Sequence, residues 1–121
     1  MIEQGNLFDK YGGVETVTFI VKEFYKRMLQ APNLKRYFIN VDVEKIIHHQ
    51  IQLISHVMGK PVSIYSGRDM KKAHKNLKIS DKSFNDTLEI LEETLIDFKV
   101  EGEDIKIMLA RVNNFKNEIT F

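Results

Sequence analysis

The sequence predicts an all-α fold, and two features of its hydrophobic pattern support this. Apolar side chains recur every three or four residues through four long segments, which is the spacing of one face of an amphipathic helix. No segment alternates apolar and polar residues as a strand does, and no internal repeat is present. With 121 residues the chain has room for one domain, so we expect residues 1–121 to form a single helical unit.

The amino-terminal half of the chain is expected to hold two long helices. The first begins after Gly12 and Gly13, a pair that leaves room for only a short helix before it. Its apolar face comprises Val14, Val17, Ile20, Val21, Phe24, Tyr25, Met28 and Leu29. Pro32 suits the first turn of a brief helix, and the second long helix is expected between Asp42, its N-cap, and Gly59. Its apolar face comprises Val43, Ile46, Ile47, Gln50, Leu53, Ile54 and Val57.

The carboxyl-terminal half is expected to begin with a loop and a short helix and to continue with two more long helices. Residues 59–67 are a loop by composition, and the short helix that follows carries Met70, Ala73, His74 and Leu77 on one face. Ser80 or Asp81 can cap the third long helix, whose apolar face comprises Phe84, Leu88, Leu91, Leu95 and Phe98. The last helix follows Gly102 and carries Ile105, Met108, Leu109, Val112, Phe115 and Ile119.

Composition excludes several classes of function. Eighteen Lys and Arg against seventeen Asp and Glu leave a net charge of +1, so no strong field attracts nucleic acid or anionic lipid. The lack of cysteine excludes disulfides, thiolate nucleophiles and cysteine-ligated metals. No cationic leader opens the sequence, and no run approaches the roughly eighteen apolar residues of a membrane span. We therefore expect a cytoplasmic protein.

The four histidines are the remaining candidates for ligand chemistry. In the second long helix His48 points away from the apolar stripe, whereas His49 lies at its edge and His56 shares that edge. His74 is centred on the apolar face of its short helix. A buried histidine bonded to a backbone carbonyl is the commoner explanation, and zinc is disfavoured because the HExxH pattern is missing. A single imidazole on an apolar face also suits the proximal bond to haem iron.

Two polar side chains join His74 on otherwise apolar faces. Gln50 lies in the middle of its stripe, and a buried amide needs a hydrogen-bond partner. Tyr25 follows Phe24, and its hydroxyl needs a partner if it is buried. A core tyrosine bonded to a backbone oxygen is the commoner case. Polar groups from three helices pointing into one core nevertheless favour a shared polar ligand there.

The chain resembles the group I truncated haemoglobins along nearly its whole length. The resemblance is carried in order by Gly12-Gly13, Phe24-Tyr25, Leu34 with Tyr37-Phe38, Gln50, Tyr65 with Gly67-Arg68 and Met70, and Ala73-His74. It implies a two-over-two α-helical sandwich of B, E, G and H helices around haem b. It also implies that His74 is the proximal iron ligand and that Phe38 packs on the haem face.

The resemblance assigns the remaining pocket residues as well. Tyr25 and Gln50 are expected to donate hydrogen bonds to bound dioxygen, and Ile46 stands where ordinary globins have the distal histidine. The other expected cofactor contacts are Leu53, Met70 and the candidate propionate contacts Lys45, Tyr65 and Arg68. Some relatives use a histidine at the place of His49 as a second axial ligand, and we weigh this equally with a partly solvated His49.

Three functions are therefore open. The first is a haem b protein that reversibly binds dioxygen, nitric oxide and carbon monoxide and carries out nitric oxide dioxygenation with an external reductase, Tyr25 and Gln50 holding the oxy complex. The second is a bis-histidyl haem protein for electron transfer or redox sensing. The third is a cofactor-free helical interaction module. We expect a monomer in each case.

Overall fold

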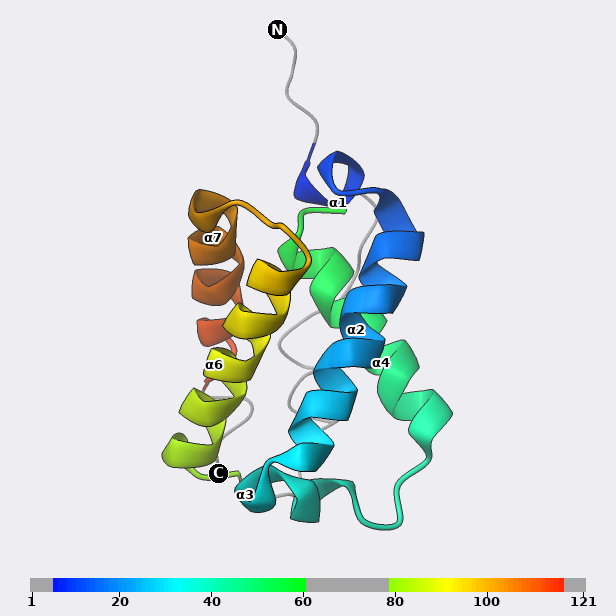
Figure 1. The fold of residues 1–121 in the computed structure, drawn as a ribbon, viewed down its shortest axis with the longest axis vertical. Coiled ribbons are helices and arrows are strands. Elements are labelled where there is room, and N and C mark those ends of the chain that lie inside the picture. The colour runs from blue at the N-terminus through cyan, green and yellow to red at the C-terminus, as the bar shows by residue number, and fades with distance from the viewer. Residues whose placement is uncertain (1–5, 61–78, 117–121) are drawn as a thin grey trace, which may run out of the picture.

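The computed structural model describes residues 6–60 and 79–116 (Figure 1). The helices are α1 (Leu7–Lys10), α2 (Gly13–Gln30), α3 (Pro32–Lys35), the short 3₁₀ helix η1 (Arg36–Phe38), α4 (Val43–Val57), α6 (Asp81–Asp97) and α7 (Gly102–Asn113). α2 packs against α4 and α6, and α6 packs against α7. Two pairs of long helices thus lie against each other, which confirms the all-α fold. Among the described residues no helix is long and apolar enough to cross a membrane.

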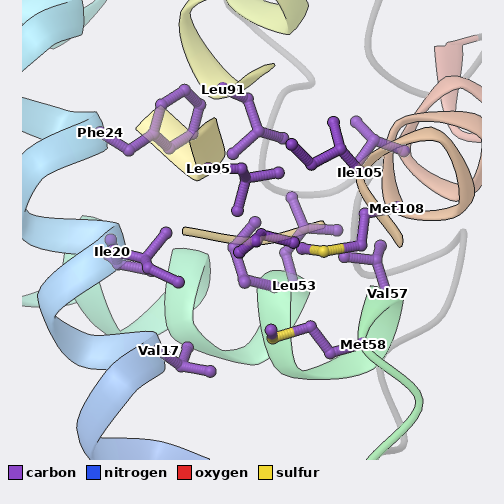
Figure 2. Packing of buried hydrophobic residues seen from close by; sticks show 14 of the residues in the cluster. Val17, Ile20, Phe24, Leu53, Val57, Met58, Leu91, Leu95, Ile105 and Met108 are labelled. Carbon is purple, nitrogen blue, oxygen red and sulfur yellow. The ribbon is translucent and has the colours of Figure 1, made fainter. Parts of the chain in front are cut away.

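One core joins the long helices (Figure 2). Phe24 and Ile20 of α2, Leu95 of α6 and Met108 of α7 all point into it. The buried hydrophobic residues are Val17, Ile20, Val21, Phe24, Met28, Leu34, Leu53, Ile54, Val57, Met58, Phe84, Leu91, Leu95, Val100, Ile105, Met108 and Val112. Most of them lie on the apolar faces expected from the sequence.

Two residues that the sequence places on the apolar helix faces are exposed instead of buried, so the prediction is wrong for them. Val14 is 57% exposed and Val43 is 49% exposed. Each lies in the first turn of its helix, ahead of the first buried position, which is Val17 in α2 and Gln50 in α4. Helical spacing places a residue on a face, but it does not show how far along that face the neighbouring helix extends.

The carboxyl end of α4 closes with a Schellman motif. The backbone N–H of Gly59 donates to the carbonyl of His56 (2.9 Å), and that of Lys60 donates to the carbonyl of Ser55 (3.0 Å). Gly59 has φ +85°, which glycine adopts without strain, and a Cβ there would come within 3.3 Å of Asn6 Cβ. The expected end of this helix before Gly59 is confirmed.

Neighbouring helices also hold this end of α4. Arg111 of α7 donates from Nη1 to the carbonyl of Val57 (2.6 Å), and the backbone N–H of Phe8 donates to the carbonyl of Met58 (3.0 Å). These bonds satisfy carbonyls that the helix leaves unpaired at its end. They attach α4 to both α1 and α7.

A polar cluster ties α1 to the start of α7. The hydroxyl of Tyr11 donates to Asp104 Oδ2 (2.5 Å) and accepts from the backbone N–H of Glu101 (3.0 Å). The Lys10 ammonium donates to Asp104 Oδ2 (2.8 Å) and to Glu101 Oε1 (2.6 Å). Hydrogen bonds from Lys10 and Tyr11 hold the pKa of Asp104 below its ordinary value.

Replacing Tyr11 with Phe is expected to lower the free energy of unfolding by about 1 kcal/mol at neutral pH. Because the folded pKa of Asp104 is lowered, its contribution to stability is present above the ordinary carboxyl pKa. That contribution is lost as pH falls through the lowered value, so the deficit of Tyr11→Phe should shrink in acid. Urea unfolding from neutral pH to about pH 3 measures this. Asp9→Asn is the control, and a pH-independent deficit would contradict the prediction.

Candidate functional site

A cavity of about 450 Å³ opens among α2, α4, α6 and the α3–η1 segment. Its wall is largely apolar. The lining residues are Phe24, Met28, Leu34, Tyr37, Phe38, Val41, Lys45, Ile46, His49, Gln50, Leu53, Ile54, Ile79, Phe84, Thr87, Leu88, Leu91 and Val112. A space of this size in a chain of this length is typical of a ligand site, since protein cores are otherwise closely packed.

α4 supplies the more polar side of the cavity. Ile46, His49, Gln50 and Leu53 follow one another at intervals of three, one and three residues and line it together. The helix is started by Asp42, whose Oδ1 accepts from the backbone N–H groups of Glu44 (3.1 Å) and Lys45 (3.3 Å). The N-cap expected at Asp42 is thereby confirmed.

Gln50 is the most informative residue on this wall. Its side chain is buried, with 8% of the residue exposed, and Oε1 has no hydrogen-bond partner among residues 6–60 and 79–116. Leaving a buried polar atom unpaired costs about 1–3 kcal/mol, and native structures seldom accept this cost without a functional reason. Gln50 therefore indicates that the occupant of the cavity carries, or brings with it, a polar group.

The three histidines of α4 are distributed as expected. His48 is exposed on the side of the helix away from the cavity, and His49 is half-buried on the cavity wall. His56 is half-buried and its ring centroid lies 5.9 Å from that of Phe115. Only His49 brings an imidazole to the described part of the cavity.

Tyr25 lies beside the cavity rather than on its wall. Its ring meets that of Phe38 edge to face, with centroids 5.4 Å apart and an angle of 87° between the ring planes. Phe38 lines the cavity, whereas Tyr25 is half-buried and does not appear among the lining residues. The structure thus brings together Phe38, Lys45, Ile46, His49, Gln50 and Leu53, with Tyr25 packed behind Phe38.

Sequence reasoning missed the opposite wall of the cavity. Phe84, Leu88 and Leu91 were expected as ordinary core residues of the third long helix, and they line the cavity with Thr87. Helical spacing cannot distinguish a residue that packs in the core from one that lines a cavity, because both lie on the same face of the helix. Tyr37 was also missed. Its hydroxyl donates to Ser83 Oγ (3.3 Å) and accepts from Arg36 Nη2 (3.1 Å), so its polar end is satisfied outside the cavity.

Four of the expected site residues lie outside the described residues, namely Tyr65, Arg68, Met70 and His74. Within residues 6–60 and 79–116, no group of three or more His, Asp or Glu side chains lies close enough together to hold a metal ion.

Comparisons with known proteins agree on one family. A sequence model of the family described as bacterial-like globin matches residues 6–121. The group 1 truncated hemoglobin GlbN of Synechocystis sp. is 34% identical over 110 residues, which cover 88% of this chain and 87% of that protein. The group 1 truncated hemoglobin of Tetrahymena thermophila is 30% identical over 105 residues, covering 87% and 86%.

Solved structures agree with the sequence comparisons. The 2/2 hemoglobin of Synechococcus sp., in the cyanomet state and with covalently attached heme, superposes with a TM-score of 0.84 at 27% identity and covers 95% of this chain and 98% of that one. The Fe(III) form of the truncated hemoglobin of Tetrahymena pyriformis reaches a TM-score of 0.85 at 24% identity, covering 96% and 98%, and supports the fold.

Proposed function

Because the chain belongs to the bacterial-like globin family, within its group 1 truncated hemoglobins, and binds diatomic gases through haem, we propose that it converts nitric oxide to nitrate with the help of an external reductase. In this reaction nitric oxide, dioxygen and one electron combine to give nitrate. The observation that carries the proposal is the Oε1 of buried Gln50, which lies on an apolar cavity wall and has no partner in the described part of the chain. If the cavity held only an apolar molecule, this buried amide oxygen would be left without a polar partner, which costs free energy.

The residues of the cavity fit haem b. Phe38 and exposed Lys45 both line the cavity, which supports assigning Phe38 to packing on the haem ring and Lys45 to a propionate. His74 is assigned as the proximal ligand, Met70 as a further haem contact, and Tyr65 and Arg68 as further propionate contacts. When bound, haem supplies a ferrous iron that takes up diatomic ligands and exchanges single electrons.

The chain's own residues then decide how long a diatomic ligand stays. The amide of Gln50 is assigned as a hydrogen-bond donor to the ligand, with its Oε1 accepting from a neighbouring hydroxyl or water. The Tyr25 hydroxyl is assigned as the main donor to the ligand, and its ring is held edge to face against Phe38. Ile46 and Leu53 can donate nothing, and they exclude water so that the polar contacts act in a low dielectric.

The proposal is tested with the haem-loaded protein in its ferric, ferrous and carbonyl forms, followed by anaerobic mixing of the oxygenated protein with nitric oxide. We expect the amount of nitrate formed to equal the amount of oxygenated protein that is converted to the ferric form. Repeated turnover should occur only when a reductant is supplied. A chain that takes up no haem would support the helical interaction module instead. Haem uptake without nitrate formation would leave gas binding in place and exclude the dioxygenase reaction.

His49 supports a second candidate function, a bis-histidyl haem protein for electron transfer or redox sensing. It is the one described imidazole on the cavity wall, one residue before Gln50. A second axial ligand from α4 would compete with exogenous ligands, which would then wait for its bond to open.

Under this second function the ferrous protein is expected to show sharp, resolved visible bands. His49→Ala should convert them to the broad five-coordinate spectrum and speed carbon monoxide binding. The matched control is His48→Ala, which removes an exposed imidazole from the opposite side of the same helix and should leave the spectrum unchanged. A ferrous wild-type protein that is already five-coordinate at neutral pH would exclude the bis-histidyl form.

A further inference from the structure

The outer face of α2 carries an exposed stripe that mixes charge with a large apolar ring. Phe19 is 56% exposed, and exposed Lys22 and Lys26 follow it at three and seven residues. Exposed Glu15 precedes it by four residues. Neither lysine takes part in an ion pair within the described residues. Like charges four residues apart destabilise a helix slightly, so the stripe carries a cost that the monomer does not offset.

The outer face of α6 carries a stripe of the opposite charge. Ile96 is 55% exposed, and exposed Glu93 and Glu89 precede it by three and seven residues. Exposed Lys99 comes two residues after the end of α6 and is not part of this stripe. These two glutamates also lack an ion pair among the described residues, although other carboxylates of α6 have one.

The two stripes match when they run in opposite directions. With Phe19 set against Ile96, the spacing pairs Lys22 with Glu93 and Lys26 with Glu89. A parallel arrangement with the same apolar contact would instead place Glu15 near Glu93. Only the antiparallel register sets both lysines of α2 against glutamates of α6.

Within one molecule both stripes face the same side. α2 and α6 pack together and run in opposite directions (Figure 1), and Arg27 bridges them by donating to Asp97 Oδ2 (2.6 Å). Lys26 comes one residue before Arg27, and Ile96 comes one residue before Asp97. Each side chain is therefore rotated by about 100° around its helix axis from the residue that forms the bridge. Because the helices are antiparallel, the same backward rotation carries both stripes to the same side of the pair.

The stripes also lie at similar levels along the two helices. Ile20 and Leu95 both point into the same buried cluster (Figure 2), and Phe19 and Ile96 are each one residue away from these two. A two-fold axis parallel to the helices therefore sets Phe19 of one copy against Ile96 of the other. The same axis sets α6 of the first copy against α2 of the second. The contact is therefore made twice, and the assembly is complete with two copies.

We propose that this chain forms a two-fold dimer in which α2 of each copy lies antiparallel on α6 of the other. The dimer goes beyond the proposed gas chemistry and does not depend on it, and it departs from the monomer expected from the sequence. Exposed ion pairs contribute little individually and salt screens them. The association is therefore weak, with a dissociation constant on the order of 0.1 mM at low salt.

Sedimentation equilibrium of the haem-loaded chain tests the dimer, between roughly 0.01 and 1 mM at low and high salt. At low salt the wild-type mass should rise from that of one haem-loaded chain toward twice that value, and high salt should return it to the monomer. Lys26→Glu and Glu89→Lys should each remain monomeric. The matched control is Lys106→Glu, which makes the same charge change on an exposed residue of α7 and should associate like wild type.

Two combinations make the test specific to the register. The double variant Lys26→Glu/Glu89→Lys should dimerise again, because the charges are exchanged across the same contact. An equimolar mixture of the two single variants should also form a heterodimer, since both contacts of that pair join opposite charges. A wild-type protein that stays monomeric throughout, or single variants that associate normally, would overturn the proposal. Masses that rise beyond the dimer would overturn the closed two-fold arrangement.

Discussion

Replacing His74 with Gly is expected to abolish stable haem retention. The assignment makes this imidazole the proximal ligand, and no other histidine of the chain lies at the centre of an apolar helical face. Haem transfer to a stronger acceptor, followed by absorbance, should be complete in the variant under conditions in which the wild type keeps its haem. Added imidazole should restore a bound spectrum by entering the space left by the side chain. Normal haem retention by His74→Gly would remove the proximal assignment.

Loss of haem should also appear in stability. A group that binds only the folded chain stabilises it by mass action, so the haem-loaded wild type should melt well above its haem-free form. His74→Gly should melt close to the haem-free wild type whether or not haem is added. His48→Gly is the matched control because it removes an exposed imidazole. Equal melting temperatures for the loaded and haem-free wild type would contradict this expectation.

Tyr25→Phe is expected to speed dioxygen dissociation by about ten-fold, and Gln50→Leu by less. A hydrogen bond to a ligand that carries negative charge is worth about 1–2 kcal/mol in a dry pocket. The phenol ranks first because its ring is held on a rigid helix against Phe38, whereas the amide of Gln50 rotates more freely. Stopped-flow displacement of dioxygen by carbon monoxide measures both rates.

Tyr37→Phe is the control for this comparison. It removes a hydroxyl from another tyrosine at the cavity, but that hydroxyl is bonded to Ser83 and Arg36. The dissociation rate should therefore stay near that of the wild type. If neither Tyr25→Phe nor Gln50→Leu changes the rate by more than about a factor of two, these side chains do not hold the ligand.

The helices could be predicted from the sequence because their signals are local. Asp42 and Ser80 cap α4 and α6 as expected, with Ser80 accepting from the backbone N–H of Ser83. Gly59 ends α4 because it can adopt a positive φ. α6 ends with the same hydrogen-bond pattern, but the residue with positive φ there is Lys99 (φ +67°) and not a glycine. The buried neighbours Leu95 and Val100 are bonded across that turn, and packing therefore fixes an end that local propensity does not mark.

The candidate site could be predicted only in part. Gln50 was recognisable as an amide within an apolar stripe, and its burial with no partner for Oε1 in the described ranges supports that interpretation. Tyr25 shares the spacing of the apolar face, yet its ring packs behind Phe38 instead of lining the cavity. Helical spacing gives the direction of a side chain to within about one residue's rotation, which does not separate a wall position from one beside it.

The sequence by itself determined the helical fold, the family and the face of each long helix that turns inward, because these follow from residue type and spacing along one segment. Only the tertiary structure decided where the helices leave a cavity of about 450 Å³ and that Arg111 and Phe8 hold the end of α4. Each of these features depends on the relative placement of segments far apart in the chain. Packing of whole helices sets that placement, and no local pattern encodes it.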